Sequence, residues 1–137
     1  MTLARFPISA DQINDVVTEF YRRIRLHDVL GPVFFKTVPD EPQIWAAHEE
    51  KISRFWRNAI LFERNYDGNP QQIHSQRPAV LPGHFELWLD LFDETVNDTL
   101  PEDLAASWSA LAHRIGAGLR MGVTHARQKA GDVPSLT

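Results

Sequence analysis

Hydrophobic residues recur at steps of three and four in four segments of the chain, which is the pattern of amphipathic helices. The first segment runs from residue 9 to residue 27. Its apolar face is formed by Ile13, Val16, Val17, Phe20, Tyr21 and Ile24. Ser9 and Gln12 have the spacing of a capping box, in which two side chains satisfy the first free backbone donors of a helix. We therefore predict that a helix begins directly after Ser9.

The three other helices are predicted to begin near Pro42, near Pro82 or Gly83, and at Pro101. After the first segment, Gly31 and Pro32 end the helical region, and residues 33–35 form only a short apolar patch. No alternating strand pattern occurs along the chain. The prediction is an all-α fold with four main helices in a single domain, 1–137, whose ends, 1–8 and 128–137, are loosely attached.

The stretch between the second and third predicted helices, 63–81, is polar and contains Gly68, Pro70 and Pro78. It has no long periodic stripe. Long loops in a compact domain are usually functional or disordered. Here one histidine, His74, follows the apolar Ile73.

Composition and charge exclude several kinds of site. The chain has no cysteine, which excludes thiolate nucleophiles, iron–sulfur clusters and thiolate-ligated haem. Its net charge of −4 argues against a nucleic-acid partner. No apolar run approaches the ~20 residues of a membrane span, and the start of the chain has no signal-peptide pattern. We therefore expect a cytoplasmic protein without a membrane partner.

The common catalytic motifs do not fit. His48 is followed by two glutamates, but a zinc-binding pair would need a second histidine at position 52, where isoleucine stands. Asp90, Asp93 and Glu94 fall on the polar side of their predicted helix, which disfavours a two-carboxylate hydrolase. The glycines 116, 118 and 122 indicate close approach of another helix or of a flat cofactor. Two histidines stand out: His48, inside an apolar helical stripe, and His74, in the long loop.

Taken together, the chain resembles the truncated haemoglobins, specifically their third group, from about residue 20 to residue 119. The matching stretches are 20–21 with 30–34, then 45–48 with Ile52 and 55–56, then 66–70 through His74, and 85–92. Their spacing is specific: 13 positions from Tyr21 to Phe34, 26 from His48 to His74 and 14 from His74 to Trp88. The paired-glycine signatures of the other two groups are missing. The resemblance implies a two-over-two helical sandwich around haem b.

The resemblance also implies roles for single residues. His74 matches the proximal histidine that binds the iron, with its second ring nitrogen donating to a carbonyl or water. Phe34 matches the aromatic residue that wedges against the porphyrin. The distal positions are matched by Tyr21, His48, Ile52 and Trp88.

Other residues complete the expected haem pocket. Lys51 stands where a cation can reach a haem propionate, and Phe55 and Phe85 would be apolar walls. The loop after His74 is poorer in apolar residues and prolines than is usual in the family. Its Arg77 either pairs with a propionate or faces solvent.

Three functions remain open at this point. The first is reversible binding of O₂, NO or CO, with Tyr21 and Trp88 as hydrogen-bond donors and His48 as a gate rather than a donor or a sixth iron ligand. The second is a haem redox enzyme served by a reductase, with NO dioxygenase, nitrite reductase or peroxidase activity. The third is a cofactor-free helical interaction module. We expect a monomer or a weak dimer.

Overall fold

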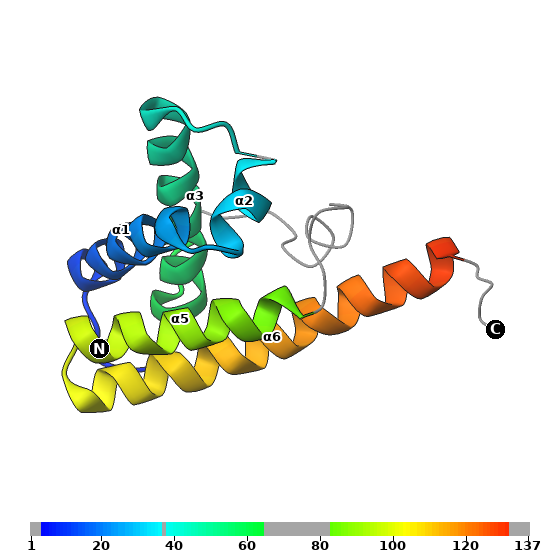
Figure 1. Ribbon diagram of the computed structural model, residues 1–137. Helices are drawn as coiled ribbons and strands as arrows, with labels where there is room; N and C mark the ends of the chain where they lie inside the picture. Colours follow the sequence, from blue (N-terminus) through cyan, green and yellow to red (C-terminus); the bar gives the residue numbers. More distant parts are fainter. Residues whose placement is uncertain (1–3, 37, 65–82, 132–137) are drawn as a thin grey trace.

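The computed structural model describes residues 4–36, 38–64 and 83–131, with side chains described up to residue 124. The helices of this part of the chain are α1 (Ala10–Leu26), α2 (Leu30–Phe35), α3 (Pro42–Leu61), α5 (His84–Thr99) and α6 (Glu102–Gly131). Figure 1 shows α5 and α6 lying side by side and antiparallel, while α1 and α3 cross each other over this pair. The predicted all-α, two-over-two architecture is confirmed.

Helix α1 begins as its sequence predicts. The Ser9 hydroxyl accepts the backbone N–H of Gln12 at 3.1 Å, and the Gln12 side chain accepts the backbone N–H of Ser9 at 2.9 Å. This is a complete capping box. All six residues of the predicted apolar face are buried, because this face of α1 packs on both α3 and α5.

Helix α2 was not predicted and corrects our interpretation of residues 33–35. Pro32 is the third residue of the helix, where a backbone N–H has no intrahelical partner, so that its missing donor costs nothing. The ring Nδ1 of His27 accepts the backbone N–H groups of Val29 and Leu30, both at 3.1 Å, and stabilises the start of the helix. A Cβ on Gly31 would lie 2.9 Å from the carbonyl oxygen of Arg25, so glycine is needed for α2 to lie this close to α1.

The ends of the domain, 1–8 and 128–137, lie only partly within the described residues. Before α1, the backbone N–H of Arg5 donates to the carbonyl of Ile60 at 2.9 Å, its Nε donates to the carbonyl of Ala59 at 2.7 Å, and Ile8 is buried. These contacts attach residues 4–8 to the end of α3. At the other end, α6 continues through residue 128 to Gly131.

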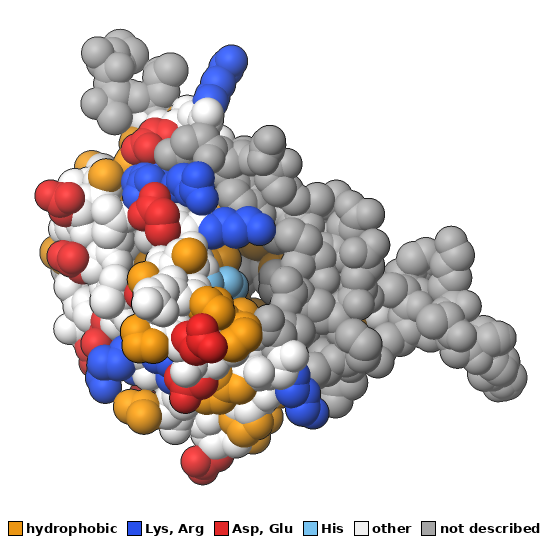
Figure 2. Space-filling view, turned by 90° about the horizontal axis from the view of Figure 1, so that it is seen from above, with side chains coloured by type: hydrophobic (Ala, Val, Ile, Leu, Met, Phe, Trp, Pro, Cys, Tyr) orange, Lys and Arg blue, Asp and Glu red, His pale blue; other side chains and the backbone are white. Residues whose placement is uncertain are grey.

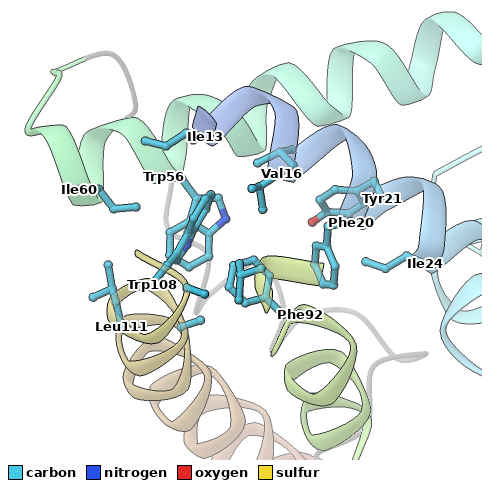
Figure 3. Close-up of a cluster of buried hydrophobic side chains, with 14 of the residues drawn as sticks. Ile13, Val16, Phe20, Tyr21, Ile24, Trp56, Ile60, Phe92, Trp108 and Leu111 are labelled. Carbon is cyan, nitrogen blue, oxygen red and sulfur yellow. The ribbon is translucent and has the colours of Figure 1, made fainter. Parts of the chain in front are cut away.

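The core lies where the two layers cross, and aromatic rings fill it (Figure 3). Phe92 of α5 is fully buried and stacks between Trp56 of α3 and Trp88, with centroids 5.8 and 5.6 Å away. Phe20 of α1 meets the Phe92 ring edge-on at 5.1 Å. Such pairs add about 0.5–1.5 kcal/mol each beyond the apolar area that they bury. The aromatic residues therefore fix how the α1–α3 layer sits on the α5–α6 layer.

Of the glycines 116, 118 and 122 in α6, Gly116 lies against α5. A Cβ there would be 3.1 Å from Cδ1 of Leu89. The close approach of a neighbouring helix, one of our two interpretations of these glycines, is confirmed at this position.

Candidate functional site

Four aromatic and imidazole rings from three helices meet at one place beside the core. They belong to Tyr21 of α1, Phe34 of α2, and Trp45 and His48 of α3, and we call them the four-ring cluster. Each ring lies within 6.4 Å of the other three; the shortest centroid distance, 5.2 Å, joins Tyr21 to His48. The structure thus brings together three residues for which we predicted a place in one pocket, and adds Trp45.

Local structure explains why these rings meet. Trp45 and His48 are three residues apart on α3, so they share one face of the helix. Tyr21 lies on the buried face of α1, which packs against α3. Phe34 is carried by α2, whose close approach to α1 depends on Gly31.

The electrostatics of the cluster keep the Tyr21 phenol protonated. Tyr21 is only 3% exposed, and burial raises its pKa; the nearby charge of Glu49 raises it further. At neutral pH this side chain can therefore donate a hydrogen bond.

An ion pair from α1 to α3 flanks the cluster. Arg25 Nη1 lies 3.0 Å from a carboxylate oxygen of Glu49, and the guanidinium lies over the Trp45 ring at 5.1 Å. Burial raises the pKa of Glu49, while Arg25 opposes this effect. Arg25 thus contacts two residues one helical turn apart on α3, and His48 lies between them in the sequence.

Trp88 occupies a separate place. Its ring stacks on Phe92 and meets Phe20 edge-on at 5.3 Å, and Phe20 in turn contacts Tyr21 at 5.4 Å. Within the described part of the chain, Trp88 is therefore connected to the four-ring cluster through Phe20 rather than by a ring contact of its own. Its side chain is half-buried.

The other predicted haem contacts lie mostly along α3. His48, Ile52 and Phe55 follow one another at helical spacing and are half-buried, and Lys51 beside them is exposed. Phe85 of α5 is buried in a small second cluster with Leu119 and Val123. His74 and Arg77 lie outside the described residues, so their predicted roles stay predictions.

Sequence reasoning gave Trp45 no role. It was one of several apolar residues in the α3 stripe, and its only distinguishing signal is its position three residues before His48. The structure shows a further property: the ring is 2% exposed, and its Nε1 finds no hydrogen-bond acceptor in the part of the chain that is described.

These residues fit a flat, largely apolar group with polar ends, as haem is. Phe34, Ile52, Phe55 and Trp88 pack against the core but stay partly exposed, which leaves apolar surface that such a group would cover. Lys51 offers a cation beside them, and the Trp45 N–H is a buried donor in need of an acceptor. Figure 2 shows a histidine surrounded by hydrophobic side chains, with Lys and Arg side chains nearby.

A group of three polar side chains between α5 and α6 is also a candidate for a catalytic site. Asp93 accepts a hydrogen bond from the Ser109 hydroxyl and lies 2.8 Å from Nε2 of His113. Because serine and histidine both contact the same carboxylate, the histidine is not placed to take the serine proton, as a nucleophilic triad requires. This group therefore links two helices rather than forming a hydrolase site.

The described residues contain no group of three or more His, Asp or Glu side chains that could hold a metal ion. None of their helices combines the length and apolar character needed to cross a bilayer.

Comparison with known proteins adds the family. The chain is 32% identical to the group 3 truncated hemoglobin ctb of Campylobacter jejuni over 97 residues, which are 71% of this chain and 76% of that protein. The chain belongs to the group III truncated haemoglobins. A crystal structure of a group III truncated haemoglobin from Campylobacter jejuni matches it with a TM-score of 0.82 and 27% identity, over 88% of this chain and 95% of that one. No family model matches the chain.

Membership of this family confirms the resemblance drawn from the sequence. It also accounts for the layered arrangement of the helices, because the structural match extends over most of both chains.

Proposed function

We propose that this truncated haemoglobin binds haem b and that its function is the reversible binding of a diatomic ligand, O₂, NO or CO. The observation that carries the proposal is the four-ring cluster, in which Tyr21, Phe34 and His48 meet although they come from three helices. The partly covered apolar side chains on α2, α3 and α5 support it.

Each residue has a defined task in this proposal. His74 would bind the iron, and Lys51 and Arg77 would pair with the propionates. Apolar side chains exclude water from the pocket, namely those of Phe34, Ile52, Phe55 and Phe85. This exclusion would slow the oxidation of the haem iron. Bound ferrous haem would supply the electron-rich iron at which the diatomic ligand binds.

The remaining side chains act on the ligand. Tyr21 donates a hydrogen bond to it, and its raised pKa keeps that proton in place at neutral pH. Trp88 is the second donor, and its ring is connected to the four-ring cluster through Phe20. His48, which is half-buried, is the gate between pocket and solvent.

Titration of the purified apo chain with haemin tests the proposal. We expect a Soret band that saturates near one haem per chain, and after reduction a reversible shift of this band with CO. A chain that stays colourless would contradict haem binding and would favour a cofactor-free module. Rapid turnover of NO by the oxygenated form in the presence of a reductase, measured by stopped flow, would instead favour the redox enzyme.

A further inference from the structure

The indole N–H of Trp45 donates no hydrogen bond within the described part of the fold. The residue is 2% exposed, and its Nε1 is buried without an acceptor among the described residues. Buried donors in folded proteins are nearly always paired, so an unpaired one needs an explanation. One explanation is an acceptor that arrives with a ligand.

The surroundings of Trp45 indicate which ligand that is. Its ring lies 6.1 Å from Tyr21, 5.6 Å from His48 and 6.4 Å from Phe34, all of which line the pocket of the proposed function. Tyr21 and His48 also bring polar atoms to this place. The Trp45 ring therefore packs against three residues that we assign to the pocket of the diatomic ligand, and it also contacts Phe35 at 5.6 Å.

The Trp45 ring also contacts Arg25, which is paired with Glu49. The Arg25 guanidinium lies over the ring at 5.1 Å, and Glu49 anchors the guanidinium at 3.0 Å. A cation over the ring uses the π face, and it leaves the N–H, which lies in the plane of the ring, available for another partner. The side chains of Arg25 and Glu49 are 30% and 16% exposed, so this pair is less screened by solvent than a fully exposed one.

Trp108 offers a comparison within the same chain. Its Nε1 is also buried without an acceptor among the described residues. Its ring contacts, however, are Trp56 and Phe92 in the core, at 5.5 and 5.3 Å. Figure 3 shows Trp108 at the opposite end of the core from Tyr21. An unpaired indole N–H thus occurs both beside the pocket and away from it, which makes Trp108 a matched control.

We propose that Trp45 is a further hydrogen-bond donor of the ligand pocket, whose N–H donates to the bound diatomic ligand, and that Arg25 and Glu49 are positioning residues that hold its ring. This inference rests on the proposed function and adds a donor to it. The acceptor is an oxygen atom of the ligand, so NO, CO and O₂ all qualify.

The test compares Trp45→Phe with Trp108→Phe, both reconstituted with haem. Trp45→Phe keeps an aromatic side chain, although a smaller one, and removes the donor; Trp108→Phe makes the same change of size. One neutral hydrogen bond corresponds to about 2- to 12-fold in an equilibrium constant, so we expect O₂ to dissociate faster by this factor. We also expect the infrared C–O stretch of the CO complex to move to higher frequency, because a donor at the oxygen polarises the C–O bond. Trp108→Phe should change neither quantity.

The positioning role has its own variants. Arg25→Gln and Glu49→Gln should move the C–O stretch in the same direction as Trp45→Phe, by a smaller amount. Arg25→Lys, which keeps the cation, should restore the wild-type frequency. If Arg25→Lys behaves like Arg25→Gln, the positioning role is refuted.

A measurement on the unaltered protein guards against a variant that fails to fold. In the CO complex of the ¹⁵N-labelled chain, the indole proton of Trp45 should exchange with solvent more slowly than in the apo chain, while that of Trp108 keeps its rate. An unchanged Trp45 exchange rate, or a Trp45→Phe variant that binds one haem with an unmoved C–O stretch and an unchanged dissociation rate, would overturn the inference. Neither result would affect the proposed function, which fails only if the wild-type chain binds no haem.

Discussion

Gly31 sets how closely α2, and with it Phe34, approaches α1, and replacing it tests this packing. A Cβ at position 31 would lie 2.9 Å from the carbonyl oxygen of Arg25 and 3.2 Å from that of Ile24. Both are backbone atoms, so they cannot rotate away, and α2 has to shift. Overpacking of this kind costs about 1–3 kcal/mol. Alanine regains about 0.8–1.0 kcal/mol through its higher helix propensity.

The net prediction for Gly31→Ala is therefore a loss of about 1 kcal/mol in the free energy of unfolding. For a chain of this size the loss corresponds to a fall of about 3–5 °C in the melting temperature. Urea denaturation followed by circular dichroism gives the energy. The near-ultraviolet spectrum should change as well, because Phe34 moves relative to Tyr21.

Gly116→Ala is the matched control for this prediction. Its Cβ would lie 3.1 and 3.2 Å from the two terminal methyl carbons of Leu89, which can rotate to make room. Helix propensity then prevails, and we expect a variant that is unchanged or more stable by up to about 1 kcal/mol. We thus expect a close contact with backbone atoms to destabilise the fold, whereas one with a flexible side chain does not. A Gly31→Ala variant that proves as stable as Gly116→Ala would refute this explanation.

Three further predictions follow from the core and from the titrating groups. Phe92→Ala should lower the free energy of unfolding by about 3–5 kcal/mol, measured in urea, because the ring is fully buried among four other aromatic rings; a loss below 1 kcal/mol would contradict its central place. Glu49→Gln should lower the pKa of Tyr21, since it removes a negative charge that raises it; absorbance titration against Tyr21→Phe measures this, and an unmoved pKa would contradict it. Two neighbouring arginines lower the pKa of Glu19 from 4.5 to about 2, so the stabilisation it provides is present above pH 4.5 and is lost as the pH falls toward 2. Because the Glu19 side chain is partly exposed and solvent screens its ion pairs, Glu19→Gln should remove less than about 1 kcal/mol of this dependence in acid unfolding curves, and a larger loss would contradict this screening.

Much of the fold could be predicted because it depends on local signals. The capping box and the three-and-four spacing place the start of α1 at the residue that the structure shows. Pro42, in a position that suits the first turn, begins α3, and Pro101 immediately precedes α6. These signals act within a few residues, so one sequence is enough to read them.

Helix α2 could not be predicted because its support comes from a side-chain cap at His27 and from packing on α1, neither of which has a periodic pattern. Gly31 and Pro32 disfavour a helix by local propensity. The structure counters this with the His27 ring, which accepts two backbone N–H groups, and with packing on α1. In this helix of six residues, these contacts outweigh the low helix propensity of Gly31 and Pro32.

The candidate site also contains residues that the sequence predicts and one that it does not. Tyr21, Phe34 and His48 were predicted because their types and spacing match a known family. Trp45 was missed because its significance comes from the contact with Arg25 across two helices and from an N–H without an acceptor, neither of which a sequence shows.

The central claim is that this chain holds haem through His74. The most direct measurement is the Soret absorption of His74→Ala after mixing with haemin, compared with wild type and with His84→Ala as a control at another histidine. The account predicts a near-stoichiometric band in wild type and in His84→Ala, its loss in His74→Ala, and its return when free imidazole is added. A His74→Ala protein that keeps the wild-type spectrum would contradict the account.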